Sequence, residues 1–111
     1  MLPEGHEKKA QRLEATIAKL SDSPDYEMII ESCYAAAVQY LALLCARRLR
    51  NHQDTHKGLP AFLEKNGLSD LATSFRNLEL LRTSRYYGVR GNGSAAKEAK
   101  RTLAEIKARL H

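Results

Sequence analysis

Aromatic residues are scarce in this chain of 111 residues. There is no tryptophan, and tyrosine and phenylalanine together make up only 6% of the sequence. Leucine and alanine must therefore fill the core, and both are strong helix formers. The length predicts a single domain over residues 1–111.

Cysteine is also scarce, with only Cys33 and Cys45 present. Twelve residues of one helix separate them by about 18 Å. A disulfide needs Cα atoms within roughly 7 Å, so the two cannot pair inside one helix. We expect two small, buried, free thiols in a protein of a reducing compartment.

A long apolar run is missing too. The N-terminus has no apolar signal core, and the longest apolar stretch, residues 33–46, is interrupted by Gln39. This stretch is shorter than a bilayer-spanning helix needs and is typical of a core helix. We therefore expect a cytoplasmic protein that does not associate with a membrane.

The charge is positive but mixed. Eighteen lysines and arginines stand against thirteen acidic residues, which gives a net charge of +5. This balance favours an anionic partner, although interspersed charge of both signs is also typical of a solvated surface.

Apolar residues recur at helical spacing, and no segment shows the alternation of a strand. We expect five helices, over residues 7–20, 24–50, 59–66, 69–87 and from Ser94 onward. Ser23 is expected to cap the second helix, Asn66-Gly67 to end the third and Ser94 to cap the fifth. The predicted fold class is all-α, an up-and-down bundle of four to five helices. The expected core stripes of the first, fourth and fifth helices are Ala10, Leu13, Ile17 and Leu20; Leu71, Phe75, Leu78 and Leu81; and Ala99, Leu103, Ile106 and Leu110.

The second helix is apolar on nearly every face between Cys33 and Ala46. A helix of this kind must be covered on every side. Because four other short helices offer little cover, we expect a homodimer in which this helix packs on a second copy of the chain.

The order of motifs resembles the HEPN superfamily, small prokaryotic helical proteins often encoded beside minimal nucleotidyltransferases. The resemblance rests on the following features, in order: the Ala-rich second helix with Tyr34 and Tyr40; His56-Lys57-Gly58-Leu59 with Phe62; Leu78-x-x-Leu81-x-x-x-Arg85-Tyr86-Tyr87-Gly88; and an Ala-rich last helix. It covers residues 25–108 and implies a dimeric helical bundle. It also implies a nucleotidyltransferase as a partner.

Many members of this superfamily are metal-independent, toxin-type ribonucleases with an Arg-x(4–6)-His signature on a late helix. The late helix of this chain has Arg76, Arg82 and Arg85 with no histidine at that spacing. The spacing occurs only elsewhere, in Arg47 with His52 and in Arg50 with His56. These four residues are the candidate catalytic groups of the ribonuclease alternative.

No metal site or cofactor is expected. His52 and His56 are four residues apart, but no third ligand lies near them in the sequence. The glycine-rich segment 88–94 could cradle a phosphate, but no strand precedes it, so the phosphate-binding fingerprints do not apply.

The most suggestive candidate ligand site is Arg82, Arg85 and Tyr86, together with Lys57. Guanidinium groups bind phosphate through paired donors, and tyrosine rings stack on bases. Alternatively, Tyr86 is a core residue and the arginines bridge to Glu31 or Glu79. The sequence thus predicts a non-catalytic binding module for RNA or a nucleotide, with a ribonuclease and a purely structural interaction protein as the alternatives.

Overall fold

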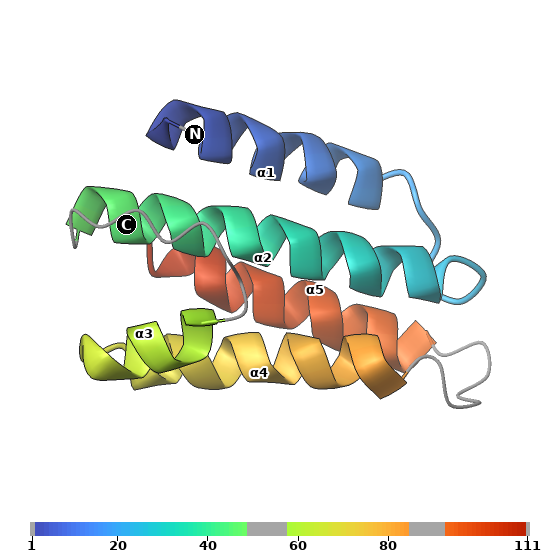
Figure 1. Ribbon diagram of the computed structural model, residues 1–111. Helices are drawn as coiled ribbons and strands as arrows, with labels where there is room; N and C mark the ends of the chain where they lie inside the picture. Colours follow the sequence, from blue (N-terminus) through green and yellow to red (C-terminus); the bar gives the residue numbers. More distant parts are fainter. Residues whose placement is uncertain (1, 49–57, 85–92, 111) are drawn as a thin grey trace.

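The computed structural model describes residues 2–48, 58–84 and 93–110 (Figure 1). Within these ranges the chain is helical and contains no strand, which confirms the all-α class. The helices are α1 (Pro3–Ile17), α2 (Tyr26–Arg48), α3 (Leu59–Lys65), α4 (Ser69–Ser84) and α5 (Gly93–Ala108).

The four long helices lie alongside one another, and each runs opposite to the long helix before it in the sequence (Figure 1). Helix α2 is central, because α1, α4 and α5 all pack against it. Helix α3 packs on α4, and α4 also packs on α5. The result is the predicted up-and-down bundle.

The predicted core stripes are confirmed. Most of their members are buried, and Leu13, Leu20, Leu81 and Leu110 are partly buried against the same core. Cys33 and Cys45 are buried and unpaired, as expected. The spacing of apolar residues therefore identified the inward face of α1, α4 and α5 correctly.

Helix α2 is covered within a single chain. Its side chains at Cys33, Tyr34, Ala36, Ala37 and positions 40–45 are all buried. Our premise that four short helices leave it uncovered is wrong, because α1, α4 and α5 approach different sides of it and its alanines allow close contact. The homodimer through residues 33–46 stays a prediction, but an uncovered face of α2 no longer supports it.

One helical segment, Tyr26–Arg47, has the length and apolar composition to cross a membrane. Its 22 residues exceed the apolar stretch 33–46 on which our expectation was based. Within the described chain 72% of its apolar window is buried, as is typical of a core helix.

Three helix starts differ from prediction. Helix α1 spans Pro3–Ile17 rather than residues 7–20, because proline is favoured at the first position of a helix. Helix α2 begins at Tyr26, and Asp25 takes the capping position expected for Ser23. The Asp25 carboxylate accepts a hydrogen bond from the Ser21 N–H at 2.8 Å. The Asp25 carbonyl accepts the first hydrogen bond of the helical pattern, from the Ile29 N–H. The turn at residues 22–25 thus shifts the start by two residues. Helix α5 begins at Gly93, so Ser94 lies inside it.

The predicted end of α3 is confirmed. Gly67 has a φ of 79°, in the left-handed region that favours glycine. The Leu68 N–H reaches back to the Leu63 carbonyl at 2.8 Å, and the Gly67 N–H to the Glu64 carbonyl at 3.2 Å. This pair of bonds is a Schellman motif, which turns the chain directly into α4.

Candidate functional site

Most of the predicted site residues lie outside the described part of the chain. They are Arg50, His52, His56, Lys57, Arg85 and Tyr86. Only Arg47 and Arg82 are described, and each forms an ion pair.

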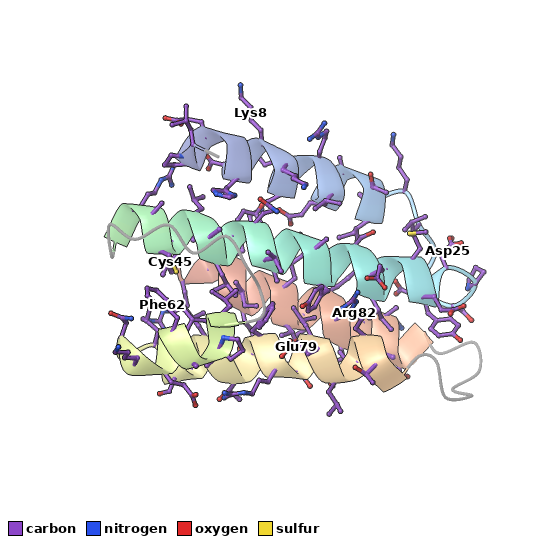
Figure 2. The ribbon with its side chains drawn as sticks, viewed as in Figure 1. Lys8, Asp25, Cys45, Phe62, Glu79 and Arg82 are labelled. Carbon is purple, nitrogen blue, oxygen red and sulfur yellow. The ribbon has the colours of Figure 1, made fainter. Side chains whose placement is uncertain are left out.

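Arg82 of α4 lies half-buried against α2 (Figure 2). Its Nε donates to Glu31 Oε1 at 2.7 Å, and its guanidinium carbon lies 4.6 Å from the centre of the Tyr34 ring. Tyr34 in turn stacks on Phe75, with ring centres 5.3 Å apart. Burial raises the pKa of Tyr34. The bridge to Glu31, which was the structural alternative for Arg82, is confirmed.

Arg47 lies near the end of α2 and joins it to α1. Its Nη2 lies 3.4 Å from Glu7 Oε1, and both side chains are exposed. Beside this pair, His6 is buried, a feature that sequence analysis missed. The His6 Nδ1 and Gln39 Oε1 atoms lie 2.8 Å apart and link the same two helices.

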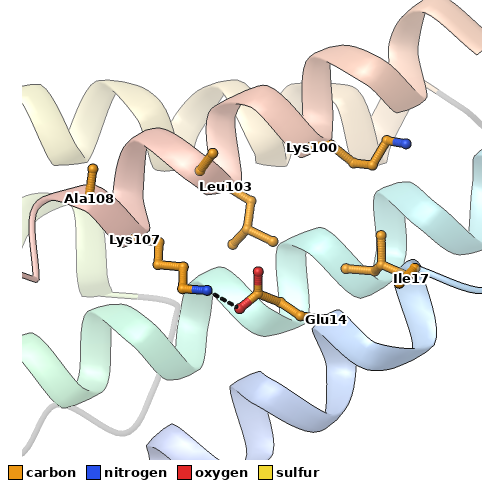
Figure 3. A pocket seen from close by; sticks show the side chains of 8 residues that line it. Glu14, Ile17, Lys100, Leu103, Lys107 and Ala108 are labelled. Carbon is orange, nitrogen blue, oxygen red and sulfur yellow. Dashed lines mark ion pairs between the residues drawn. The ribbon is translucent and has the colours of Figure 1, made fainter.

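A groove of about 550 Å³ runs between α1 and α5 (Figure 3). It exists because both helices pack on α2 more extensively than on each other. Its size lies within the range of small-molecule sites. Its apolar lining comes from Ile17, Ala18, Leu103, Ala104 and Ala108, and its charged lining from Glu14, Lys100 and Lys107.

Glu14 is the polar centre of this groove. Its Oε2 accepts a hydrogen bond from the Tyr40 hydroxyl of α2 and lies 3.1 Å from Lys107 Nζ of α5. Burial, followed by the bond to the Glu14 carboxylate, raises the pKa of Tyr40 well above its ordinary value. Tyr40 is therefore a neutral hydrogen-bond donor at neutral pH, and the cluster is suited to binding and positioning rather than to proton removal.

The outer face of α1 is basic. Lys8, Lys9 and Arg12, with Lys19 just beyond the helix, are all exposed, and Lys8 points away from the bundle (Figure 2). None of the four forms an ion pair with any residue that the structure describes. Lys8 and Arg12 are one turn apart and border an open depression of about 530 Å³.

Cations elsewhere are mostly neutralised. In the described ranges, seven pair with acidic side chains: Arg47, Arg76, Arg82, Lys100, Arg101, Lys107 and Arg109. The exposed pair of Arg76 with Glu64 is bidentate, at 3.0 and 2.9 Å, and it lowers the pKa of Glu64. The outer face of α1 is therefore the main concentration of uncompensated positive charge among the described residues.

Sequence analysis missed this basic face. The signal was present in the spacing of Lys8, Arg12 and Lys19, but Glu7 and Glu14 are interspersed with them. Only the fold shows that these two acids turn inward to Arg47 and Lys107.

No family model matches the chain, and no match was found among curated proteins or solved structures. In the described ranges, no three side chains of the metal-ligating types gather in one place. The assignment of a function therefore rests on the geometry of the chain itself.

Proposed function

We propose that this protein is a non-catalytic helical module that binds single-stranded RNA on the outer face of α1. The observation that carries the proposal is the row of exposed cations at Lys8, Lys9, Arg12 and Lys19, which has no acidic partner among the described residues. Positive groups of this kind bind phosphates and release counterions.

The length of the row favours a polyanion over a single nucleotide. Lys8 and Lys19 are eleven residues apart, about 16 Å along a helix at 1.5 Å per residue. A single phosphate group contacts only one or two of these side chains, whereas successive phosphates of one strand can contact all four.

The predicted site around Arg82 is less suited to phosphate. The Arg82 guanidinium already bonds Glu31 and lies over the Tyr34 ring. A phosphate would have to compete with a carboxylate that is partly buried beside it. We therefore transfer the proposed contact from Arg82 to α1.

The HEPN-like dimer and the nucleotidyltransferase partner remain part of the proposal. Helix α1 precedes the residues that carry the resemblance, 25–108, so its basic face is an addition to that bundle. A partner bound elsewhere on the bundle is compatible with RNA on α1.

The test is fluorescence anisotropy with a labelled single-stranded RNA at several salt concentrations. Four phosphate contacts predict a slope of about −2.8 for log K against log salt. The double variant Lys8→Gln/Arg12→Gln should weaken binding and make the slope shallower by about 1.4.

The matched control is Lys65→Gln/Lys97→Gln, which removes the same charge from exposed positions on α3 and α5. Equal loss in both double variants would show general electrostatic attraction and contradict the assignment to α1. RNA cleavage that His56→Ala abolishes would contradict the non-catalytic part of the proposal.

A further inference from the structure

The groove between α1 and α5 is separate from the basic outer face of α1 and is built differently. Its lining is mostly apolar, and Glu14 of α1 and Lys107 of α5 meet in it, whereas Lys100 points away from them (Figure 3). Small, mostly apolar concavities with a few placed polar groups are typical of ligand sites. The outer face of α1, by contrast, presents hydrated cations.

The lining of the groove carries one more positive than negative charge, and Asp22, which pairs with Lys100, lies outside that lining. The lining contains two lysines, Lys100 and Lys107, against the single carboxylate of Glu14. A ligand with an apolar body and one negative head group is therefore complementary to it.

The two lysines are not equivalent. Lys100 Nζ lies 2.5 Å from Asp22 Oδ1, a buried oxygen that accepts no other hydrogen bond from the described residues. Moving Lys100 onto a ligand would leave that buried carboxylate oxygen without a partner, which is costly.

Lys107 can turn toward a ligand at lower cost. Its partner Glu14 also accepts the Tyr40 hydroxyl, so this carboxylate keeps a donor when Lys107 contacts a second anion. The head group of a ligand therefore belongs at Lys107.

The apolar body has a continuous path from that point. Leu103 points into the space between the Glu14–Lys107 pair and Ile17 (Figure 3). Ala104 and Ala108 border the same space, and their small side chains leave it open. A chain that starts at Lys107 thus runs over Leu103 toward Ile17.

We propose that the α1–α5 groove binds a small amphiphilic carboxylate, with its head group at Lys107 and its aliphatic chain along Leu103 and Ile17. This ligand site is independent of RNA binding, so either assignment can fail without the other.

The test is titration of the ¹⁵N-labelled protein with decanoate below its micelle-forming concentration, followed by amide chemical shifts. Binding should shift the amides of residues 14–18 and 100–108. Decylamine, which has a chain of the same length and a positive head group, should bind at least about tenfold more weakly, because a charged hydrogen bond contributes about 1.5–3 kcal/mol.

Two variants test the two ends of the ligand. Lys107→Gln should weaken decanoate binding about tenfold, whereas Lys97→Gln, which lies on α5 outside the groove, should not. Ala104→Trp fills the groove and should abolish binding, whereas Ala61→Trp, at an exposed position of α3, should leave it unchanged. Both alanines are exposed, so both tryptophan variants are expected to fold.

Three results would overturn the proposal. They are no decanoate binding at millimolar concentration, equal binding of decylamine, and unchanged binding in Ala104→Trp. The other possible occupant of the groove is a second copy of the chain, which a measurement of the oligomeric state in solution tests. If the protein self-associates and Ala104→Trp abolishes this, the groove is an interface between copies of the chain and the proposal fails.

Discussion

Helices α1 and α5 flank the same central helix and have similar lengths, but they distribute their charge differently. On α5, Arg101 lies 2.9 Å from Glu105 and 3.7 Å from Glu98, so these three exposed charges compensate one another within one helix. On α1, Glu7 and Glu14 turn inward to Arg47 and Lys107, and the cations stay outside.

A chain with mixed charge can thus still present one charged face. Glu7 and Glu14 take part in attaching α1 to α2 and α5, so these two acids no longer neutralise the lysines beside them in the sequence. The exposed pairs of α5 add little stability. The proposed RNA contact is therefore placed on the outer face of α1.

The largest expected effect is the loss of unfolding free energy when a core isoleucine of α5 or of α1 is truncated. Ile106 of α5 is fully buried, whereas Ile17 of α1 is 7% exposed and borders the groove. Ile106→Ala should lower the free energy of unfolding by about 4 kcal/mol and Ile17→Ala by about 2 kcal/mol. Urea denaturation measures both, and an equal or reversed order would contradict the comparison.

A second prediction concerns the polar anchor of α1. Tyr40→Phe removes the hydroxyl that donates to Glu14 and should lower the free energy of unfolding by about 1–2 kcal/mol. Glu14→Gln keeps the shape but removes the charge, and should also weaken the contact with Lys107. If Tyr40→Phe unfolds at the wild-type urea concentration, the Glu14 cluster does not hold α1.

A third prediction concerns how stability depends on pH through the two cysteines of α2, the helix against which both α1 and α5 pack. Burial on α2 raises the pKa of Cys33 to about 12 and that of Cys45 to about 11, from 9.0. The unfolded chain therefore loses these protons first. The stability that they contribute is complete below pH 9 and is lost as the pH rises toward 11–12.

The melting temperature should consequently fall between pH 9 and pH 11. In the Cys33→Ala/Cys45→Ala variant this decline should be smaller. Ellman's reagent supplies an independent check, because both thiols should react slowly in the native protein and rapidly in urea. Fast reaction of both in the native state would show that α2 is not covered as described.

The smallest expected effect lies on the exposed side of α5. Arg101→Ala removes two exposed ion pairs and should change the free energy of unfolding by about 0.5 kcal/mol or less. It should leave RNA binding unchanged, whereas loss of binding would transfer the RNA contact from α1 to α5.

The sequence predicted the inward faces because helical spacing is a local property. Phe75 and Ile106 lie in the core as their spacing required. The start of α2 was wrong by two residues because the turn at 22–25 intervenes before Asp25 can cap the helix. The burial of α2 within one chain was also underestimated, because it depends on how closely the other helices approach the alanines of α2.

The candidate site was less predictable because its contacts join residues that are far apart in the sequence. The bridge from Arg82 to Glu31 was among the sequence-based alternatives, but the two residues are 51 positions apart and only the fold selects it. The groove between α1 and α5 involves Glu14, Tyr40 and Lys107 from three helices, and no local spacing relates them.

The most direct test of the central claim is an NMR titration of the ¹⁵N-labelled protein with single-stranded RNA. If RNA binds on α1, the largest amide shifts should fall within residues 4–19, around Lys8 and Arg12, and they should become smaller as the salt concentration is raised. Shifts concentrated on α4 or α5, with α1 unaffected, would contradict it.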